Sequence, residues 1–128
     1  MDLWNQVCSH YRARDEFRSR GVRAVNSFEC DWAIAQKRWF SDMAILGIIE
    51  RTPQLHQYRT FWNLMRSFEV KREYQMSRNI AQYCNEFSGR RIVVLCGLEH
   101  RTFLRRSFPY ADIDSKVELR EYWEYEDV

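Results

Sequence analysis

The residues best suited to chemistry stand close together at Gly97, Glu99 and His100, directly after an apolar run. A glycine lets the chain turn sharply there, and the first turn of a following helix directs N–H groups at a ligand. A histidine beside the positive helix end tends to stay neutral, which suits a metal ligand or a general base, and a neighbouring glutamate can assist it. We therefore take Glu99 and His100 as candidate catalytic residues, His100 as the candidate ligand of one divalent metal, and Gly97 as a ligand-binding position. The alternative is that Glu99 only stabilises the helix dipole and His100 is a partly exposed helix residue.

The elements around this turn predict a β-α-β unit over residues 90–128. The run Ile-Val-Val-Leu-Cys at residues 92–96 is continuous and rich in β-branched residues, which is typical of a strand buried in a parallel sheet, with Cys96 as a small buried side chain. Helical spacing resumes over residues 98–107, and alternation over residues 117–125 predicts an edge strand. Its candidate core contacts are Val117, Leu119, Tyr122 or Trp123. Since two strands alone make a marginal sheet, either helices cover it or another chain adds strands.

The preceding residues, 1–89, read as helix. A first helix ends near Gly21, Asn26 and Ser27 offer a cap for a second, Thr52-Pro53 starts a third, and Ser88-Gly89 is a stop signal. The second helix carries a core-facing stripe at Trp32, Ala35, Trp39, Met43 and Leu46. The sequence thus predicts an α/β fold: one domain spanning 1–128, mainly helical in its N-terminal two-thirds, with a small parallel sheet.

Composition narrows the classes of function. With 45% hydrophobic and 16% aromatic residues the chain should fold, and a formal net charge of +2 does not favour binding to nucleic acid. The four cysteines include no CxxC pair, and no run approaches the length of a membrane span, so a cytoplasmic location is the economical expectation. The GxSxG, GxxxxGK[ST] and GxGxxG signatures are absent.

Residues 91–100, preceded by a helix carrying Arg78-Asn79, resemble the C-terminal half of the TraB/GumN/Tiki-like superfamily. That family has an Arg-Asn or Arg-Asp pair on a helix, an apolar strand and then a GxxH motif, which Gly97 and His100 match. The resemblance implies a metal-dependent, peptidase-like hydrolase in which Arg78 stabilises an anion. The family's peptidases use two GxxH elements, whereas this sequence has one, so oligomerisation or a partner chain would have to complete the site.

Two readings of function follow from these residues. Glu73, Arg78 and Asn79 precede the strand on a helix and would serve catalysis or ligand binding only if the fold brings them towards His100; otherwise they form a solvated helix face. The favoured reading is a non-catalytic binding or assembly protein, a homo-oligomer or the partner of another protein, because aromatic side chains dominate interfaces. Its aromatic helical surface comprises Trp32, Trp39, Tyr58, Trp62 and Phe68. The alternative reading is the metal-dependent hydrolase.

Overall fold

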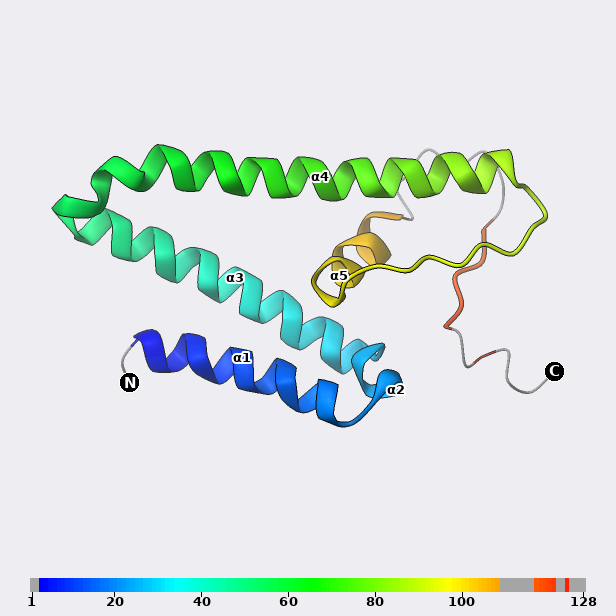
Figure 1. The fold of residues 1–128 in the computed structure, drawn as a ribbon, viewed down its shortest axis with the longest axis horizontal. Coiled ribbons are helices and arrows are strands. Elements are labelled where there is room, and N and C mark those ends of the chain that lie inside the picture. The colour runs from blue at the N-terminus through cyan, green and yellow to red at the C-terminus, as the bar shows by residue number, and fades with distance from the viewer. Residues whose placement is uncertain (1–2, 109–116, 122–123, 125–128) are drawn as a thin grey trace. The chain divides into compact units, whose positions relative to one another are not determined.

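A computed structural model describes residues 3–108, 117–121 and 124 of the chain and shows an all-helical fold (Figure 1). Helix accounts for 81% of the described residues, and none of them lies in a β-strand. A 3₁₀ helix, Pro53–Tyr58, joins the third α-helix to the fourth. The α-helices are α1 (Leu3–Ser19), α2 (Val22–Val25), α3 (Phe28–Arg51), α4 (Arg59–Glu86) and α5 (Leu98–Ser107). In this described part of the chain, no helix combines the length and the apolar character needed to cross a bilayer.

The chain divides into two compact units, Met1–Val70 and Lys71–Val128, and α4 contributes to both. The N-terminal unit holds α1, α2, α3 and the first turns of α4, whereas the C-terminal unit holds the rest of α4 and α5. Whether residues 1–128 form one domain, as the sequence predicts, is not tested by this division.

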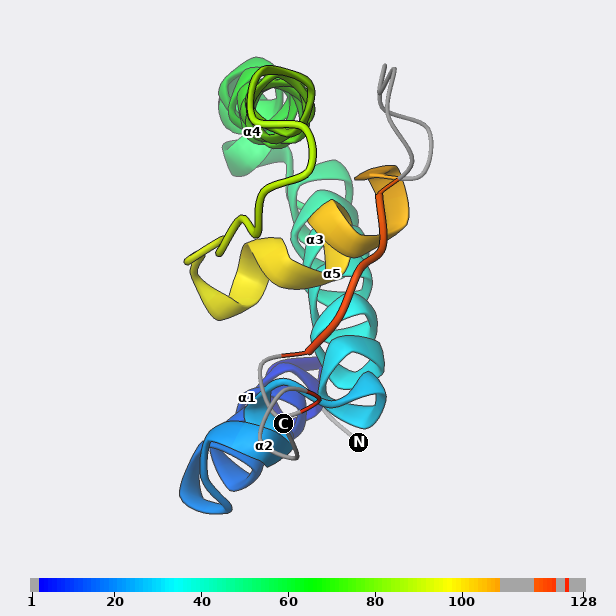
Figure 2. The same ribbon diagram turned by 90° about the vertical axis from the view of Figure 1, so that its right-hand side faces the viewer.

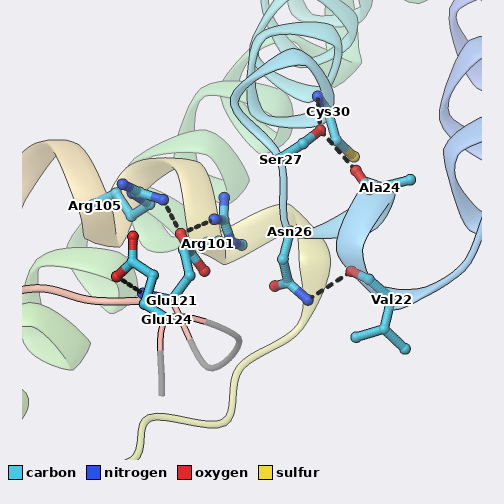
Figure 3. A network of polar contacts seen from close by, with 9 residues as sticks. All are labelled: Val22, Ala24, Asn26, Ser27, Cys30, Arg101, Arg105, Glu121 and Glu124. Carbon is cyan, nitrogen blue, oxygen red and sulfur yellow. Dashed lines mark hydrogen bonds and ion pairs between the residues drawn. The ribbon is translucent and has the colours of Figure 1, made fainter. Parts of the chain in front are cut away.

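The start of α3 confirms the predicted helix cap. Ser27 has an extended backbone, and its Oγ accepts a hydrogen bond from the Cys30 N–H at 3.1 Å (Figure 3). Glu29 and Asp31 lie in the first turn, where carboxylates favour the positive helix end. The cap and the two acids fix the point at which α3 begins.

In the N-terminal unit α1 and α3 lie side by side and run in opposite directions, as Figures 1 and 2 show. Two ring contacts join them: the Lys37 ammonium lies 4.8 Å from the centre of the Tyr11 ring, and the rings of His10 and Phe40 are 5.0 Å apart. Lys37 is buried although it is charged, and the aromatic face offers its ammonium a partner there.

The buried face of α3 is not the predicted one. Trp32, Trp39 and Met43 were expected to face the core, but they are 51%, 67% and 54% exposed. The fully buried side chains of α3 are Cys30 and Ile34 instead. Apolar residues recur on two faces of this helix, and spacing alone does not distinguish which face the protein covers. The larger side chains lie on the face that is open.

Asp42 on α3 forms an ion pair with Arg66 on α4 within the N-terminal unit. Burial raises the pKa of the Asp42 carboxyl above its ordinary value, although the Arg66 guanidinium opposes the shift. The folded chain therefore holds this proton more tightly than the unfolded chain does. The resulting stability is present below the ordinary pKa and is lost as the pH rises through the folded pKa.

An Asp42→Asn variant cannot titrate at this position, so its stability relative to wild type should depend on pH. As the pH rises from about 3 to about 7, urea unfolding should show the variant gaining unfolding free energy relative to wild type. A shift towards the wild type would mean that the ion pair with Arg66 outweighs the burial of the carboxylate.

In the C-terminal unit, α4 and α5 meet through a few specific side-chain contacts. The rings of Tyr74 and Phe103 pack edge to face with centres 5.0 Å apart, and the Ser107 hydroxyl donates to Ser77 Oγ at 3.1 Å. After α4 the chain turns at Gly89, whose φ of 78° lies in the region that favours glycine. The predicted stop at Ser88-Gly89 and the predicted helix over residues 98–107 are both confirmed.

The predicted α/β fold and its β-α-β unit are wrong. Residues 91–97 have no regular secondary structure, and Val93 and Leu95 are 78% and 92% exposed. Cys96, expected to be buried, is exposed as well. A β-branched run becomes a strand only when a neighbouring strand accepts its backbone hydrogen bonds, and strand preference depends strongly on that context. The described residues supply no such neighbour.

The second predicted strand lies partly outside the described residues. Residues 117–121 and 124 are described and none of them is in a strand, whereas Tyr122, Trp123 and Tyr125 fall outside the described part of the chain. Of the four core contacts expected here, Val117 and Leu119 are exposed. The small parallel sheet therefore has neither of its two strands among the residues described.

Candidate functional site

His100 and Glu73, both singled out from the sequence, lie in hydrogen-bond contact in the C-terminal unit. His100 Nδ1 is 3.1 Å from Glu73 Oε1, and His100 Nε2 is 3.2 Å from Arg72 Nη2. Glu73 is buried with 1% of its surface exposed, whereas the His100 side chain is 23% exposed. The fold thus places a buried carboxylate, an imidazole and a guanidinium in one row.

The donors and acceptors of this row follow from its chemistry. A guanidinium can only donate hydrogen bonds, so His100 Nε2 accepts from Arg72 and Nδ1 carries the proton donated to Glu73. A neutral imidazole oriented by a carboxylate is also how many metal-ligating and catalytic histidines are held. Here, however, Arg72 occupies the nitrogen that a metal or a transferred proton would need. Glu73 thus orients the His100 ring, and the hydrogen bond from Arg72 occupies Nε2.

Gly97 caps α5 without a conformation that only glycine can adopt. Its φ of −65° and ψ of 147° are extended, and an added Cβ would meet the His100 ring at 3.8 Å, an ordinary contact. The carbonyl of Gly97 accepts the His100 N–H at 2.9 Å. The spacing of the GxxH motif therefore serves the first turn of a helix, and glycine is not required at its first position by backbone strain.

The other predicted site residues are placed differently. Arg78 and Asn79 are exposed on α4, where Arg78 donates to Gln75 Oε1 at 2.7 Å and Gln75 donates to Asn79 Oδ1 at 2.8 Å. Arg78 is five positions after Glu73, a rotation of about 140° around the helix. Glu99 lies in the first turn of α5, where its charge favours the helix end. Arg78 and Asn79 therefore bond within α4, on a different face from the carboxylate that contacts His100.

No group of three or more His, Cys, Asp or Glu side chains that could hold a metal ion occurs among the residues described. A catalytic zinc ion normally has three protein ligands. The pair of Glu73 and His100 supplies two, and Arg72 engages the outer nitrogen of the histidine. The metal-dependent hydrolase stays a prediction.

A cluster of charged residues in the C-terminal unit was not predicted from the sequence. Glu121 accepts hydrogen bonds from both Arg101 and Arg105 of α5, and its own N–H donates to Glu124 Oε2 at 2.8 Å (Figure 3). Arg101 and Arg105 are four residues apart and so share a helix face, which is the signal that could have marked them as a pair. They join residues 117–121 to α5.

A second candidate site is an apolar row on α3 that we call the α3 stripe: Phe28, Trp32, Trp39 and Met43. These side chains fall within about 60° of one another around the helix axis. They are 76%, 51%, 67% and 54% exposed, in that order. Phe28 was missed from the sequence, although it precedes Trp32 by four residues. Of the rest of the predicted aromatic surface, Tyr58 and Phe68 are exposed and Trp62 is half-buried.

A cavity of about 200 Å³ lies where α3 meets the 3₁₀ helix, lined by Ile49, Glu50, His56 and Arg59. Glu50 and Arg59 form an ion pair across it, and His56 Nε2 is 3.0 Å from the Glu50 carbonyl oxygen. Pockets for small-molecule ligands are usually about 300–1,000 Å³ and mostly apolar. This one is smaller, and its charged groups already bond one another.

Comparison with known proteins gives no relative: no family model, no curated protein and no solved structure matches the chain. The resemblance of residues 91–100 to the TraB/GumN/Tiki-like superfamily stays a prediction. The apolar strand that this resemblance implies is absent from the described residues.

Proposed function

We propose that this chain is a helical protein-binding or assembly module that acts without catalysis, and that the α3 stripe is its binding surface. The observation that supports the proposal is the exposure of four large apolar side chains in one row. Single exposed apolar residues are normal on a protein surface, whereas contiguous apolar patches mark interaction sites. Two of the four are tryptophans, a residue type over-represented among those that contribute most to binding.

The neighbouring chemistry supports a binding role as well. The stripe itself contains no charged side chain, so a partner could cover it without stripping water from an ion. The opposite face of α3 carries the fully buried Cys30 and Ile34, which keep the helix packed in the N-terminal unit. α3 is therefore held by one face and open on the other.

The proposal is tested with the purified full chain and the apolar fluorescent probe ANS. Wild type should bind ANS at dilute protein concentration, and a Trp32→Gln/Trp39→Gln double variant should show lower fluorescence because its open apolar area is reduced, while exposed apolar side chains elsewhere, such as Leu95, keep the remainder. The matched control is Ile48→Gln, which changes a side chain of α3 that is 42% exposed but lies on another face. Equal ANS binding by the double variant and wild type would sink the proposal.

A further inference from the structure

The spacing of the α3 stripe reads the same in both directions. Its residues are separated by 4, 7 and 4 positions, so the row is symmetric about a point between Ala35 and Gln36. When two copies of such a helix pack antiparallel about a two-fold axis through that point, Trp32 of one lies opposite Trp39 of the other. Phe28 in the same way lies opposite Met43, a pairing of aromatic ring and thioether that is favourable. Parallel packing would instead set each residue opposite its own copy, so that Phe28 would meet Phe28 and Met43 would meet Met43, without the pairing of ring and thioether.

The centre of the row also suits a close helix pair. Ala35 lies on the same side of α3 as the stripe, next to the symmetry point, and its small side chain leaves room for two helices to approach to the usual 8–10 Å. The row runs from residue 28 to residue 43, a rise of about 22 Å along the helix, so several turns can take part in the contact. Antiparallel packing also sets the two helix dipoles in opposition, which is the favourable arrangement.

The open area of the α3 stripe agrees with a small, reversible pair. A large aromatic side chain removes about 150–250 Å² from water when it is fully covered, and at their observed exposures the four side chains offer about 500 Å² per copy. If all of it were covered, two copies together would bury about 1,000 Å², which is the threshold for a specific interface and falls in the range of weak, reversible contacts. An isologous contact of this kind uses the same patch twice and closes without leaving a further apolar edge.

We infer that the partner of the α3 stripe is the α3 stripe of a second copy of this chain, packed antiparallel about a two-fold axis. The inference rests on the proposed function and names its partner. The chain is then a homodimer whose centre is four tryptophans, two from each copy.

The first measurement is the dimer dissociation constant of the full chain by sedimentation equilibrium. Because a two-fold dimer carries each substitution twice, Trp39→Glu should raise the dissociation constant about 100-fold or more. Trp39 is exposed in the single copy, so the variant should keep its helical circular dichroism. Ile48→Gln should leave the dissociation constant unchanged.

The second measurement tests the antiparallel register by charge exchange. A Trp32→Lys chain mixed with a Trp39→Glu chain should form a heterodimer, because antiparallel packing places the new lysine opposite the new glutamate and restores one Trp–Trp contact. Each variant alone should dimerise weakly. Parallel packing would place residue 32 opposite residue 32, so the absence of preferential heterodimer formation would overturn the register.

Hydroxyl-radical footprinting separates failure of the inference from failure of the proposed function. Oxidation of Trp32 and Trp39 should fall as the protein concentration rises through the dissociation constant. A monomer whose two tryptophans are oxidised at every concentration would overturn the homodimer but leave the stripe open to another partner. A monomer whose two tryptophans are always protected would overturn both, because the chain itself would then cover the stripe.

Discussion

Replacing Glu73 with alanine is expected to lower the free energy of unfolding by about 2–3 kcal/mol. The carboxylate is buried and accepts the Nδ1–H of His100, so its removal leaves that donor without this partner. It also leaves a cavity on the buried face of α4. The His100 side chain is 23% exposed, and water can replace part of the lost hydrogen bond. The expected loss therefore lies at or below the lower end of the range for a broken buried pair, about 3–5 kcal/mol. Urea unfolding followed by circular dichroism measures it.

Two variants make the Glu73 result specific. Glu73→Gln keeps a side-chain oxygen that can accept from His100 and should recover most of the loss. Glu86→Ala removes a carboxylate from the same helix at an exposed position, and its effect should stay within about 0.5 kcal/mol. A Glu73→Ala protein as stable as wild type would mean that the contact with His100 contributes nothing to the fold.

Ile34→Ala is expected to cost about 2–5 kcal/mol of unfolding free energy, the usual range when a buried isoleucine is truncated to alanine. Ile34 has no exposed surface and lies on the face of α3 opposite to the α3 stripe. The lost methyl and methylene groups leave a cavity that the surrounding helices fill only in part. Thermal or urea unfolding at low protein concentration reports the change without a contribution from self-association.

Trp39→Ala is the matched control on the same helix. It removes a larger side chain from an exposed position, so the stability of the single copy should change little while dimer formation weakens. The two residues are five positions apart. Ile34→Ala should lower the unfolding free energy of the single copy, whereas Trp39→Ala should weaken dimer formation instead. If Trp39→Ala destabilises the single copy as much as Ile34→Ala does, the face assigned as open would in fact be covered within the chain.

The helices could be predicted from local chemistry, because the signals that start and stop them are themselves local. Ser27 followed by two acids defines the start of α3, and Gly89 with a positive φ follows the end of α4. The sequence could not show that residues 92–96 would lack a neighbouring strand. That depends on the rest of the chain, and a β-branched run reads the same with or without a partner.

The candidate site was predicted in part. His100 and Glu73 were both named, but 27 positions separate them, and the packing of α5 on α4 brings them together. Arg72 was missed, because its position next to Glu73 in the sequence does not show that its side chain reaches Nε2 of His100. The resemblance favoured Arg78, which bonds within its own helix. Tertiary packing, which spacing does not encode, decides each of these outcomes.

The exposed extended segment at residues 91–96 has a consequence for the chain's solubility. Short segments of high β-propensity and low net charge, when they are open to solvent, stack edge to edge into aggregates. Arg90 and Arg91 stand immediately before the apolar run, and natural sequences place charged residues beside such segments as gatekeepers against stacking. The two arginines would then protect the chain from its own copies during synthesis and refolding, a role exerted before the fold is complete.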